Sequence, residues 1–348
     1  MMTFVPPVSC RLDVPLATLT TLAVGGPARF VADDLTPEDA ITLVTAADDA
    51  GVPVLPLGGG SNVLAADAGF PGVVVRLAGG PWIPSRVGDQ VELVVPAGTS
   101  WDTLVAQTVA EGWAGLECLS GIPGCVGAAP IQNIGAYGQE AADTLVAVEV
   151  WDRHRRERCW IPAAACGFGY RQSRFKSADA GRFLVLAVRL RLTIGGPPTL
   201  RYAELAQHLA GTSPGLAQVR EAVLAIRRRK SMVYDPTDEN HRSAGSFFLN
   251  PVVPAAVADV LSAADPSMPR WPAEEGIKLS AAWLIEHAGL SRGHGVGRVG
   301  LSTRHTLALV NRGGATAGEV WALADEVCQK VRASFGIGLE PEPVRVGW

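Results

Sequence analysis

The sequence predicts an α+β protein of two domains. Its 348 residues are about twice the length of a typical domain. Strand and helix signals alternate up to residue 193, and the segment 194–200 (IGGPPTL) then has the Gly/Pro composition of a linker. Mainly helical patterns follow it. We therefore expect a mixed α+β domain over residues 15–198 and a smaller α/β domain over residues 199–348.

The apolar runs of the first domain predict its elements. A helix is expected from Pro37, with acidic residues in its first turn and Gly51 as its C-cap. A second helix is expected after Ser100, which can act as its N-cap. Strands are expected over 30–33, 52–57, 71–77, 91–98, 145–153, 155–162 and 183–192, and the runs 145–153 and 155–162 are expected to pair.

The second domain is expected to contain helices over 215–230 and 278–290 and a strand, turn and long helix over 306–336. The basic cluster Arg227–Lys230 ends the first of these helices. We interpret it as a solvated helix C-terminus, where cations are favoured by the helix dipole.

Composition excludes several classes of protein. The net charge of −4 argues against a nucleic-acid-binding protein, because such proteins use an excess of positive charge to bind phosphates. No apolar run reaches the roughly 18 residues of a membrane span, and no signal peptide is visible. The six cysteines show no CxxC spacing, which indicates reduced thiols and no metal site. We expect a cytoplasmic protein.

Two glycine-rich segments are the first candidates for a functional site. Leu57-Gly58-Gly59-Gly60-Ser61-Asn62 follows an apolar strand, and its amides could converge on phosphate oxygens unless it is a plain tight turn. The segment Ser120–Glu140 has five glycines and two prolines, so it cannot be a regular helix or a central strand. The alternative is that this segment is a series of tight turns with a purely structural role. Two such segments in one domain favour a bound diphosphate cofactor.

Three further segments carry polar candidates. Arg171 in FGYRQS could clamp a carboxylate, although a surface arginine would look the same. Ser246 in SAGSFFLNP has no GxSxG context, so we expect a proton donor rather than a nucleophile, or else a small residue in a packed strand. Glu340 and Glu342 lie between prolines in a rigid tail and could also be plain solvated acids.

Together these segments resemble the UDP-N-acetylenolpyruvoylglucosamine reductase family, from about Leu19 to the end of the chain. The matching stretches are TLAVGGPA, LGGGSNVL, GIPGCVGAAPIQNIGAYG, FGYRQSRFK, SAGSFFLNP, IKLSAAWLIE and the Glu-Pro-Glu tail. The resemblance implies noncovalent FAD in a two-lobed domain of the vanillyl-alcohol-oxidase (PCMH) type, and a smaller α/β C-terminal domain that binds the substrate. The partner is then a small molecule, and we expect a monomer.

The resemblance also implies a reaction. NADPH, as co-substrate, reduces the flavin, hydride passes to C3 of the enolpyruvyl group of UDP-N-acetylglucosamine-enolpyruvate, and a serine protonates C2 to give UDP-N-acetylmuramate. Carried over by motif, Ser246 is the proton donor, Arg171 the cation over the substrate carboxylate, and Glu342 the tail acid, acting in its protonated form. The extra Pro343 makes the tail differ from the family's usual Glu-Val-Arg, so the alignment also allows Glu340 as the acid.

Further site residues follow from the same motifs. Tyr170, Tyr202, Lys230 and Asn250 are expected to bind the substrate, with Tyr202 over its diphosphate as in the longer, type I members. The residues expected to bind FAD lie in the two glycine-rich segments: Leu57, Gly58, Gly59, Gly60, Ser61, Asn62, Gly121, Ile122, Pro123, Gly124, Gly127, Ala128, Gln132, Asn133, Gly135, Ala136 and Tyr137.

The chain departs from the family pattern in two places. Ala128 and Ala129 stand where serines are common, so backbone amides are expected to take over contacts to the FAD phosphates. The glutamine expected near the last strand is not evident around Gly295–Arg298.

Two other functions compete with this interpretation. One is an alcohol or sugar oxidase of the same fold, but none of the six histidines lies in a glycine-rich segment, where such oxidases often tether FAD. The other is a catalytically silent nucleotide-sugar-binding protein, against which the intact Arg171, Ser246 and Glu342 argue.

Overall fold

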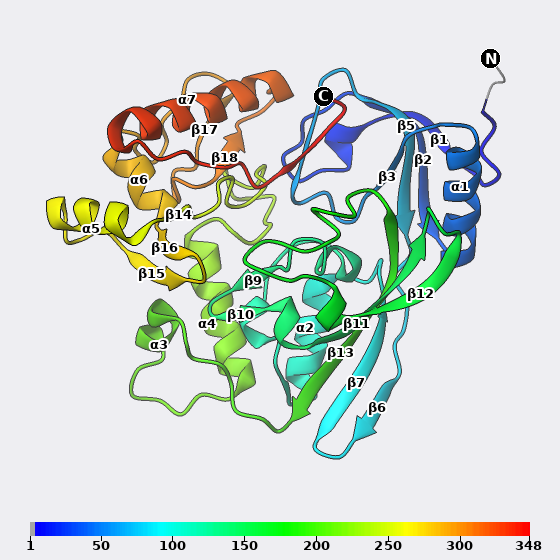
Figure 1. Ribbon diagram of the computed structural model, residues 1–348, viewed down its shortest axis with the longest axis horizontal. Coiled ribbons are helices and arrows are strands. Elements are labelled where there is room, and N and C mark those ends of the chain that lie inside the picture. Colours follow the sequence, from blue (N-terminus) through cyan, green and yellow to red (C-terminus); the bar gives the residue numbers. More distant parts are fainter. Residues whose placement is uncertain (1–3) are drawn as a thin grey trace. The chain divides into compact units, whose positions relative to one another are not determined.

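A computed structural model describes residues 4–348 and divides them into two compact units (Figure 1). Unit 1 contains the residues up to Val14 together with Ala28–Gly59 and Pro71–Val233. Unit 2 contains Pro15–Pro27, Gly60–Phe70 and Tyr234–Trp348. Each unit is described by itself below.

A four-stranded sheet forms the first part of unit 1. Its strand order is β1 (Arg11–Pro15), β2 (Pro27–Leu35), β5 (Phe70–Leu77) and β3 (Val54–Pro56). Helix α1 (Pro37–Asp49) lies against this sheet in Figure 1 and begins where the side chain of Thr36 accepts a hydrogen bond from the amide of Asp39. Buried Leu43, Val44, Val73 and Val75 share one core there.

An antiparallel sheet forms the second part of unit 1. Its path is β12 (Glu157–Pro162), β11 (Leu145–Asp152), β13 (Phe183–Ile194), β7 (Gln90–Pro96) and β6 (Pro84–Val87), and β8 (Trp113–Ala114) also pairs with β13. Helix α2 (Trp101–Ala110) contributes to the core beside this sheet. Ser100 stands at the N-cap position as expected, but its side chain makes no capping bond. The expected pairing of 145–153 with 155–162 is confirmed.

We expected a domain boundary near residue 198, but the chain stays in unit 1 until Val233. Helices α3 (Ala203–His208) and α4 (Leu216–Arg229) pack with unit 1, because Leu205, Val219 and Ile226 form a core with Cys118. The Gly/Pro-rich segment 194–200 is thus a loop inside unit 1, and the chain leaves this unit after Val233.

Unit 2 combines short sheets with three helices. Strands β14 (Val252–Val253), β16 (Gly276–Leu279) and β15 (Arg270–Ala273) form one sheet, and β17 (Val299–Leu301) pairs with β18 (Leu309–Asn311). The helices are α5 (Ala255–Ala264), α6 (Ala281–His287) and α7 (Ala317–Phe335). A capping box of Thr316 and Glu319 begins α7, and Gly336, with φ of 69°, ends it.

Two elements of unit 2 differ from the sequence prediction. Residues 278–279 belong to strand β16 instead of the first turn of a helix, since they pair with β15 and Ser280 caps α6 after them. The segment around Ser246 is extended but forms no regular strand, because only isolated bridges hold it, Ser243 to Val310 and Phe248 to Pro341.

A parallel pair of strands joins segments far apart in the sequence. β4 (Val63–Ala65) pairs with β19 (Val344–Val346), both within unit 2. Local patterns predict neither strand, because each has only three residues.

Candidate functional site

The two glycine-rich segments of unit 1 lie against each other. A Cβ atom on Gly59 would stand 2.8 Å from the Cα atom of Gly124, and one on Gly127 would stand 2.5 Å from the Cβ atom of Ala97. Real Cβ atoms do not approach so closely, so Gly59 allows the two segments to lie in contact, and Gly127 allows the second segment to pack against Ala97. The run Gly58–Asn62 passes from unit 1 to unit 2 after Gly59.

Several amides of the second glycine-rich segment are already used within the protein. The amides of Val126, Gly127, Ala128 and Ala129 donate to backbone carbonyls, and that of Gly121 donates to Asp102 Oδ1 at 2.6 Å. The amides of Ala128 and Ala129 are among those that donate within the protein, so any backbone amides that contact the FAD phosphates in place of serine hydroxyls are other ones.

Asn133 has an internal structural role. Its φ is 45°, and its Nδ2 donates to Glu140 Oε2 at 2.7 Å and to the carbonyl of Gly169 at 3.1 Å, while its Oδ1 accepts from the amide of Ala142. The side chain thus holds the end of the segment in place.

Two buried arginine nitrogens make this region suitable for an anionic cofactor. Arg227 Nε and Arg76 Nε are buried without a hydrogen-bond partner among the described residues. A Cβ atom on Gly121 would lie 3.3 Å from Arg227 Nε, and Arg76 acts electrostatically on Cys125, in the same segment. Cationic donors left without acceptors beside glycine-rich backbone fit a diphosphate such as that of FAD.

Arg227 also corrects the interpretation of the cluster Arg227–Lys230 as wholly solvated. Burial lowers the pKa of its guanidinium, and its Nη2 donates to the carbonyl of Met232 at 2.6 Å. Only Arg228 and Arg229 are exposed. The pattern of charged residues alone could not distinguish the arginine that faces inward.

Tyr137, Tyr202 and Lys230, expected to contact cofactor or substrate, come together around α3 and α4. The rings of Tyr137 and Tyr202 meet edge to face at 5.3 Å. Burial raises the pKa of Tyr137 to about 12, so its hydroxyl stays protonated near neutral pH. Lys230 Nζ donates to Glu204 Oε2 at 2.6 Å. Glu204, which the sequence did not single out, thereby orients Lys230.

Arg171 lies along the second glycine-rich segment. Its Nη2 donates to the carbonyl of Gly135 at 2.5 Å and its Nη1 to that of Asn133 at 3.5 Å. Its backbone has φ of 53°, and its guanidinium lies 5.5 Å from the ring centre of the exposed Tyr170. Unit 1 thus brings the expected catalytic arginine to residues expected to hold FAD.

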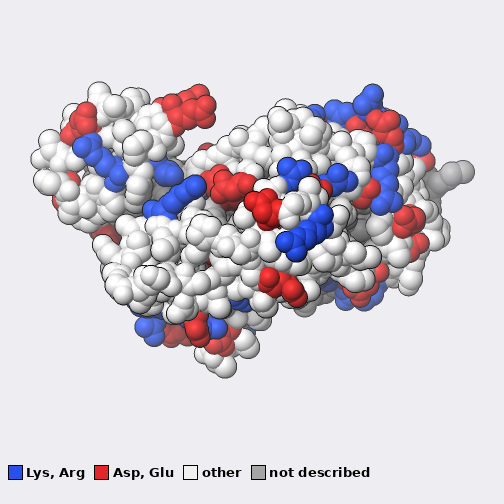
Figure 2. Space-filling view, turned by 90° about the horizontal axis from the view of Figure 1, so that it is seen from below, with Lys and Arg blue, Asp and Glu red and all other residues white. Residues whose placement is uncertain are grey.

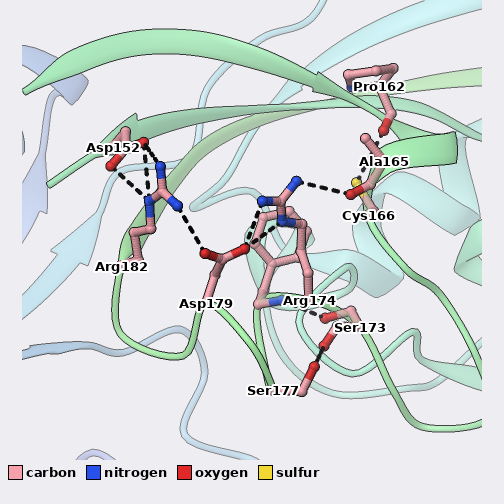
Figure 3. Close-up of polar contacts among 10 residues, drawn as sticks. Asp152, Pro162, Ala165, Cys166, Ser173, Arg174, Ser177, Asp179 and Arg182 are labelled. Atoms are coloured by element: carbon pink, nitrogen blue, oxygen red, sulfur yellow. Dashed lines mark hydrogen bonds and ion pairs between the residues drawn. The ribbon is translucent and has the colours of Figure 1, made fainter. Parts of the chain in front are cut away.

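A network of charges shapes the loop that carries Arg171 (Figure 3). Asp152, only 2% exposed, pairs with Arg182, whose Nη1 donates to Asp179, and Asp179 in turn accepts from Arg174. Buried Ser173 donates to the carbonyl of Ile131 at 2.5 Å, which ties the loop to the second glycine-rich segment. The sequence does not reveal this network, because Asp152 and Arg182 are 30 residues apart and all four side chains resemble ordinary surface charges.

The pKa of Asp152 makes part of this stabilisation depend on pH. Its hydrogen bonds with Arg182 lower that pKa to about 2, below the ordinary value of about 3.9. Stabilisation by the carboxylate is therefore complete above about pH 4 and is lost as the pH falls through about 2. We expect Asp152→Asn to unfold at lower urea than the wild type at pH 6, with a difference that shrinks toward pH 2. Asp89→Asn, at an exposed turn, is the control, and a difference independent of pH would contradict the assignment.

The contact of Gly59 with Gly124 predicts a second stability effect. In Gly59→Ala the new methyl group must push the two segments apart, which should lower the free energy of unfolding by about 1–3 kcal/mol. The FAD-to-protein ratio, measured by absorbance, should fall with it. In Gly58→Ala the Cβ atom meets Cys125 at an ordinary 3.5 Å, so its unfolding free energy should stay closer to that of the wild type. Equal destabilisation of both variants would contradict this packing argument.

In unit 2, backbone hydrogen bonds place the acidic tail beside the segment that carries Ser246. The amide of Glu342 donates to the carbonyl of Phe247 at 2.8 Å, and the amide of Leu249 donates to that of Glu340 at 2.9 Å. Phe247 and Phe248 are buried and anchor the segment. Glu342 is half-buried, whereas Glu340 is exposed. The structure therefore brings together the expected proton donor and the expected acid.

The environment of Ser246 leaves its hydroxyl available. None of the described residues forms a hydrogen bond with Ser246 Oγ, and the side chain is half-buried. Gly245, with φ of 71°, makes the turn before it. Asn62 Nδ2 donates to the carbonyl of Glu342 at 3.3 Å, so the end of the first glycine-rich run also reaches the tail.

Asn250 has a structural contact. Its Oδ1 accepts from the amide of Ala281 at 2.9 Å and so caps the first turn of α6. Its Nδ2 forms no hydrogen bond with the described residues and remains available to a substrate.

Basic and acidic side chains are interspersed over the face shown in Figure 2. The ion pairs of the protein include Arg158 with Glu149 and Arg191 with Glu92. Within residues 4–348, no helix is long and apolar enough to cross a bilayer, and no group of three metal-ligating side chains occurs. The six cysteines are free thiols.

Two family models and a solved structure of a reductase are similar to the chain. The model of the UDP-N-acetylenolpyruvoylglucosamine reductase C-terminal domain matches residues 235–346, and the model of an FAD binding domain matches residues 31–154. The UDP-N-acetylenolpyruvylglucosamine reductase of Thermus caldophilus is similar in structure, with a TM-score of 0.65 and 29% identity over 97% of this chain and 100% of that chain. The two-part FAD-binding fold with a smaller C-terminal domain is thus confirmed.

Curated relatives match nearly the full length. UDP-N-acetylenolpyruvoylglucosamine reductase from Thermobifida fusca is 48% identical over 96% of this chain and 97% of its own. The enzyme of the same name from Nocardia farcinica is 51% identical over 97% of this chain and 90% of its own. An alcohol or sugar oxidase is not favoured by these matches. The protein therefore belongs to the UDP-N-acetylenolpyruvoylglucosamine reductase family.

Proposed function

We propose that the protein reduces UDP-N-acetylglucosamine-enolpyruvate to UDP-N-acetylmuramate, with Ser246 as the proton donor. The observation that supports this most directly is the backbone pairing of residues 247–249 with the acidic tail, next to an unengaged Ser246 hydroxyl. The protein is an FAD-dependent reductase of peptidoglycan precursor synthesis, with NADPH as its reductant.

The two glycine-rich segments are proposed to hold FAD. Residues Gly58–Asn62 and Gly121–Tyr137 provide close backbone approach. The Nε atoms of Arg227 and of Arg76, whose Nη1 pairs with Asp33, provide N–H donors without acceptors among the described residues. When bound, FAD supplies the hydride, which it receives from NADPH and which is added at C3 of the enolpyruvyl group.

Arg171 is proposed to bind the carboxylate of the substrate. Addition of hydride to an α,β-unsaturated carboxylate builds negative charge on the carboxylate oxygens. A guanidinium held by the carbonyls of Gly135 and Asn133 is already oriented, so it can stabilise this charge without reorganising.

Ser246 is proposed to complete the reaction. The carbon–carbon double bond gains hydride at C3 and the proton of Ser246 Oγ at C2, and the serine then recovers a proton from water. Serine is a weak acid, but protonation of a carbanion-like carbon is strongly downhill and depends chiefly on placement.

Glu342 is proposed to donate a hydrogen bond to the same carboxylate in its protonated form. Its half-buried position supports Glu342 over the exposed Glu340. Tyr170, Tyr202, Lys230 and Asn250 are proposed substrate contacts, of which Tyr202 and Lys230 share one region of unit 1.

The free cysteines support a reducing, cytoplasmic location. We propose a monomer as the working unit. The small-molecule substrate is the proposed partner, with neither nucleic acid nor membrane.

The decisive assay follows NADPH oxidation at 340 nm and flavin absorbance. Purified protein should be yellow and should release its flavin on denaturation, because no covalent tether is proposed. NADPH oxidation should depend on UDP-N-acetylglucosamine-enolpyruvate. Oxidation that is independent of this compound and produces peroxide would instead indicate an oxidase.

A further inference from the structure

Two tryptophans and an arginine form a cluster around the tail in unit 2. Arg345 Cζ lies 4.6 Å from the ring centre of Trp321 on α7 and 5.9 Å from that of Trp348. The two rings are 6.0 Å apart. Trp348 Nε1 also donates to the carbonyl of Leu64 in β4 at 3.3 Å. The cluster therefore connects the tail to both α7 and β4.

The same tail carries Glu342, and the backbone bonds that follow this residue all go to one short segment: the amide of Val344 donates to the carbonyl of Asn62 at 2.9 Å, and the carbonyl of Val346 accepts from the amide of Ala66 at 2.8 Å. Pro341 and Pro343 have no amide hydrogen, so between Leu339 and Val344 only Glu340 and Glu342 can donate from the backbone. After Glu342, the chain is held by the three-residue pairing of β19 with β4, in which Val344 pairs with Val63 and Val346 with Ala65.

A pairing this short does not by itself define one register. A slip by two residues preserves the faces of a strand and shifts it by about 7 Å. The indole contact with Leu64 and the placement of Arg345 between two rings exist only in the observed register.

We propose that Trp321, Arg345 and Trp348 form a clasp that keeps β19 in register on β4 and thereby positions Glu342. These three are positioning residues. The proposal rests on the proposed role of Glu342 in the reaction. The clasp fixes the path of the backbone after Pro343. Hydrogen bonds to Asn62 and Phe247 hold the backbone of Glu342 itself.

The test uses the FAD-loaded enzyme and separates its two half-reactions by stopped flow. In Trp348→Ala, oxidation of the reduced flavin by UDP-N-acetylglucosamine-enolpyruvate should slow by about 10- to 100-fold, because small displacements of reacting groups have effects of this size. Reduction of the flavin by NADPH should stay at the wild-type rate. Trp348→Phe should restore only part of the lost rate, because it keeps an aromatic ring beside Arg345 but lacks the N–H that binds Leu64, and Arg345→Met should cause a smaller loss than Trp348→Ala.

The matched control is Trp271→Ala. Trp271 is 40% exposed on β15, which pairs with β16 and not with β4 or β19. It should leave both half-reactions unchanged. Slowing of both half-reactions in Trp348→Ala, or no slowing of either, would overturn the clasp.

A double-mutant cycle distinguishes failure of the clasp from failure of the role of Glu342. If the clasp acts through Glu342, adding Trp348→Ala to Glu342→Gln should slow substrate-driven oxidation little further. Additive losses would overturn the clasp and leave the role of Glu342 intact. A wild-type rate in Glu342→Gln alone would overturn that role, and the positioning proposal with it.

Discussion

Replacement of Ser246 by alanine should slow formation of UDP-N-acetylmuramate by about 10²- to 10⁴-fold, the usual contribution of a general acid. Reduction of the flavin by NADPH should be unaffected. Ser246 Oγ forms no hydrogen bond with the described residues, so the substitution removes the proton-donating hydroxyl group and leaves the buried Phe247 and Phe248 beside it in place. Stopped-flow measurement of the two half-reactions separates these effects.

Ser267→Ala is a suitable control, since it removes a hydroxyl from an exposed turn of unit 2. Thermal unfolding of both variants should resemble that of the wild type. Normal product formation in Ser246→Ala would remove the serine from the mechanism. Loss of flavin reduction together with product formation would indicate damage to the cofactor site instead.

Replacement of Arg171 should have the second large effect. In Arg171→Ala, kcat/KM for the enolpyruvyl substrate should fall by about 10²- to 10³-fold, as expected when a preorganised donor to a developing negative charge is removed. Arg171→Lys should recover only part of this loss, because an ammonium group cannot bind both carboxylate oxygens in the planar geometry of guanidinium.

The flavin content of these variants must be measured as well. Arg171 donates to the carbonyl of Gly135, so its loss could loosen the second glycine-rich segment. A lower FAD-to-protein ratio that accounts for the whole loss of activity would contradict direct action on the carboxylate. Arg155→Ala, at an exposed arginine of the β11–β12 hairpin, should be without effect.

Much of the fold and the candidate site could be predicted from the sequence, because the signals are local. Apolar periodicity and caps located α1, α2, α4 and α7, and the glycine and proline pattern marked the two segments that lie together in unit 1. The motifs around Arg171 and Ser246 predicted the family, and the full-length relatives confirm it.

Other features depend on residues far apart in the sequence. Pro15–Pro27 and Gly60–Phe70 belong to unit 2, although both precede the expected boundary near residue 198. Residues 278–279 became a strand because β14 and β15 offer hydrogen-bonding partners on either side, which outweighs their local helical pattern.

The family and the cofactor class could be predicted from the sequence because both depend on contiguous motifs, and the same motifs supply the candidate residues for the reaction. The inward position of Arg227, the Asp152 network that holds the Arg171 loop and the pairing of the tail with β4 are seen only in the folded chain. Burial, ion pairing and strand register depend on contacts between segments far apart in the sequence, so no local pattern predicts them.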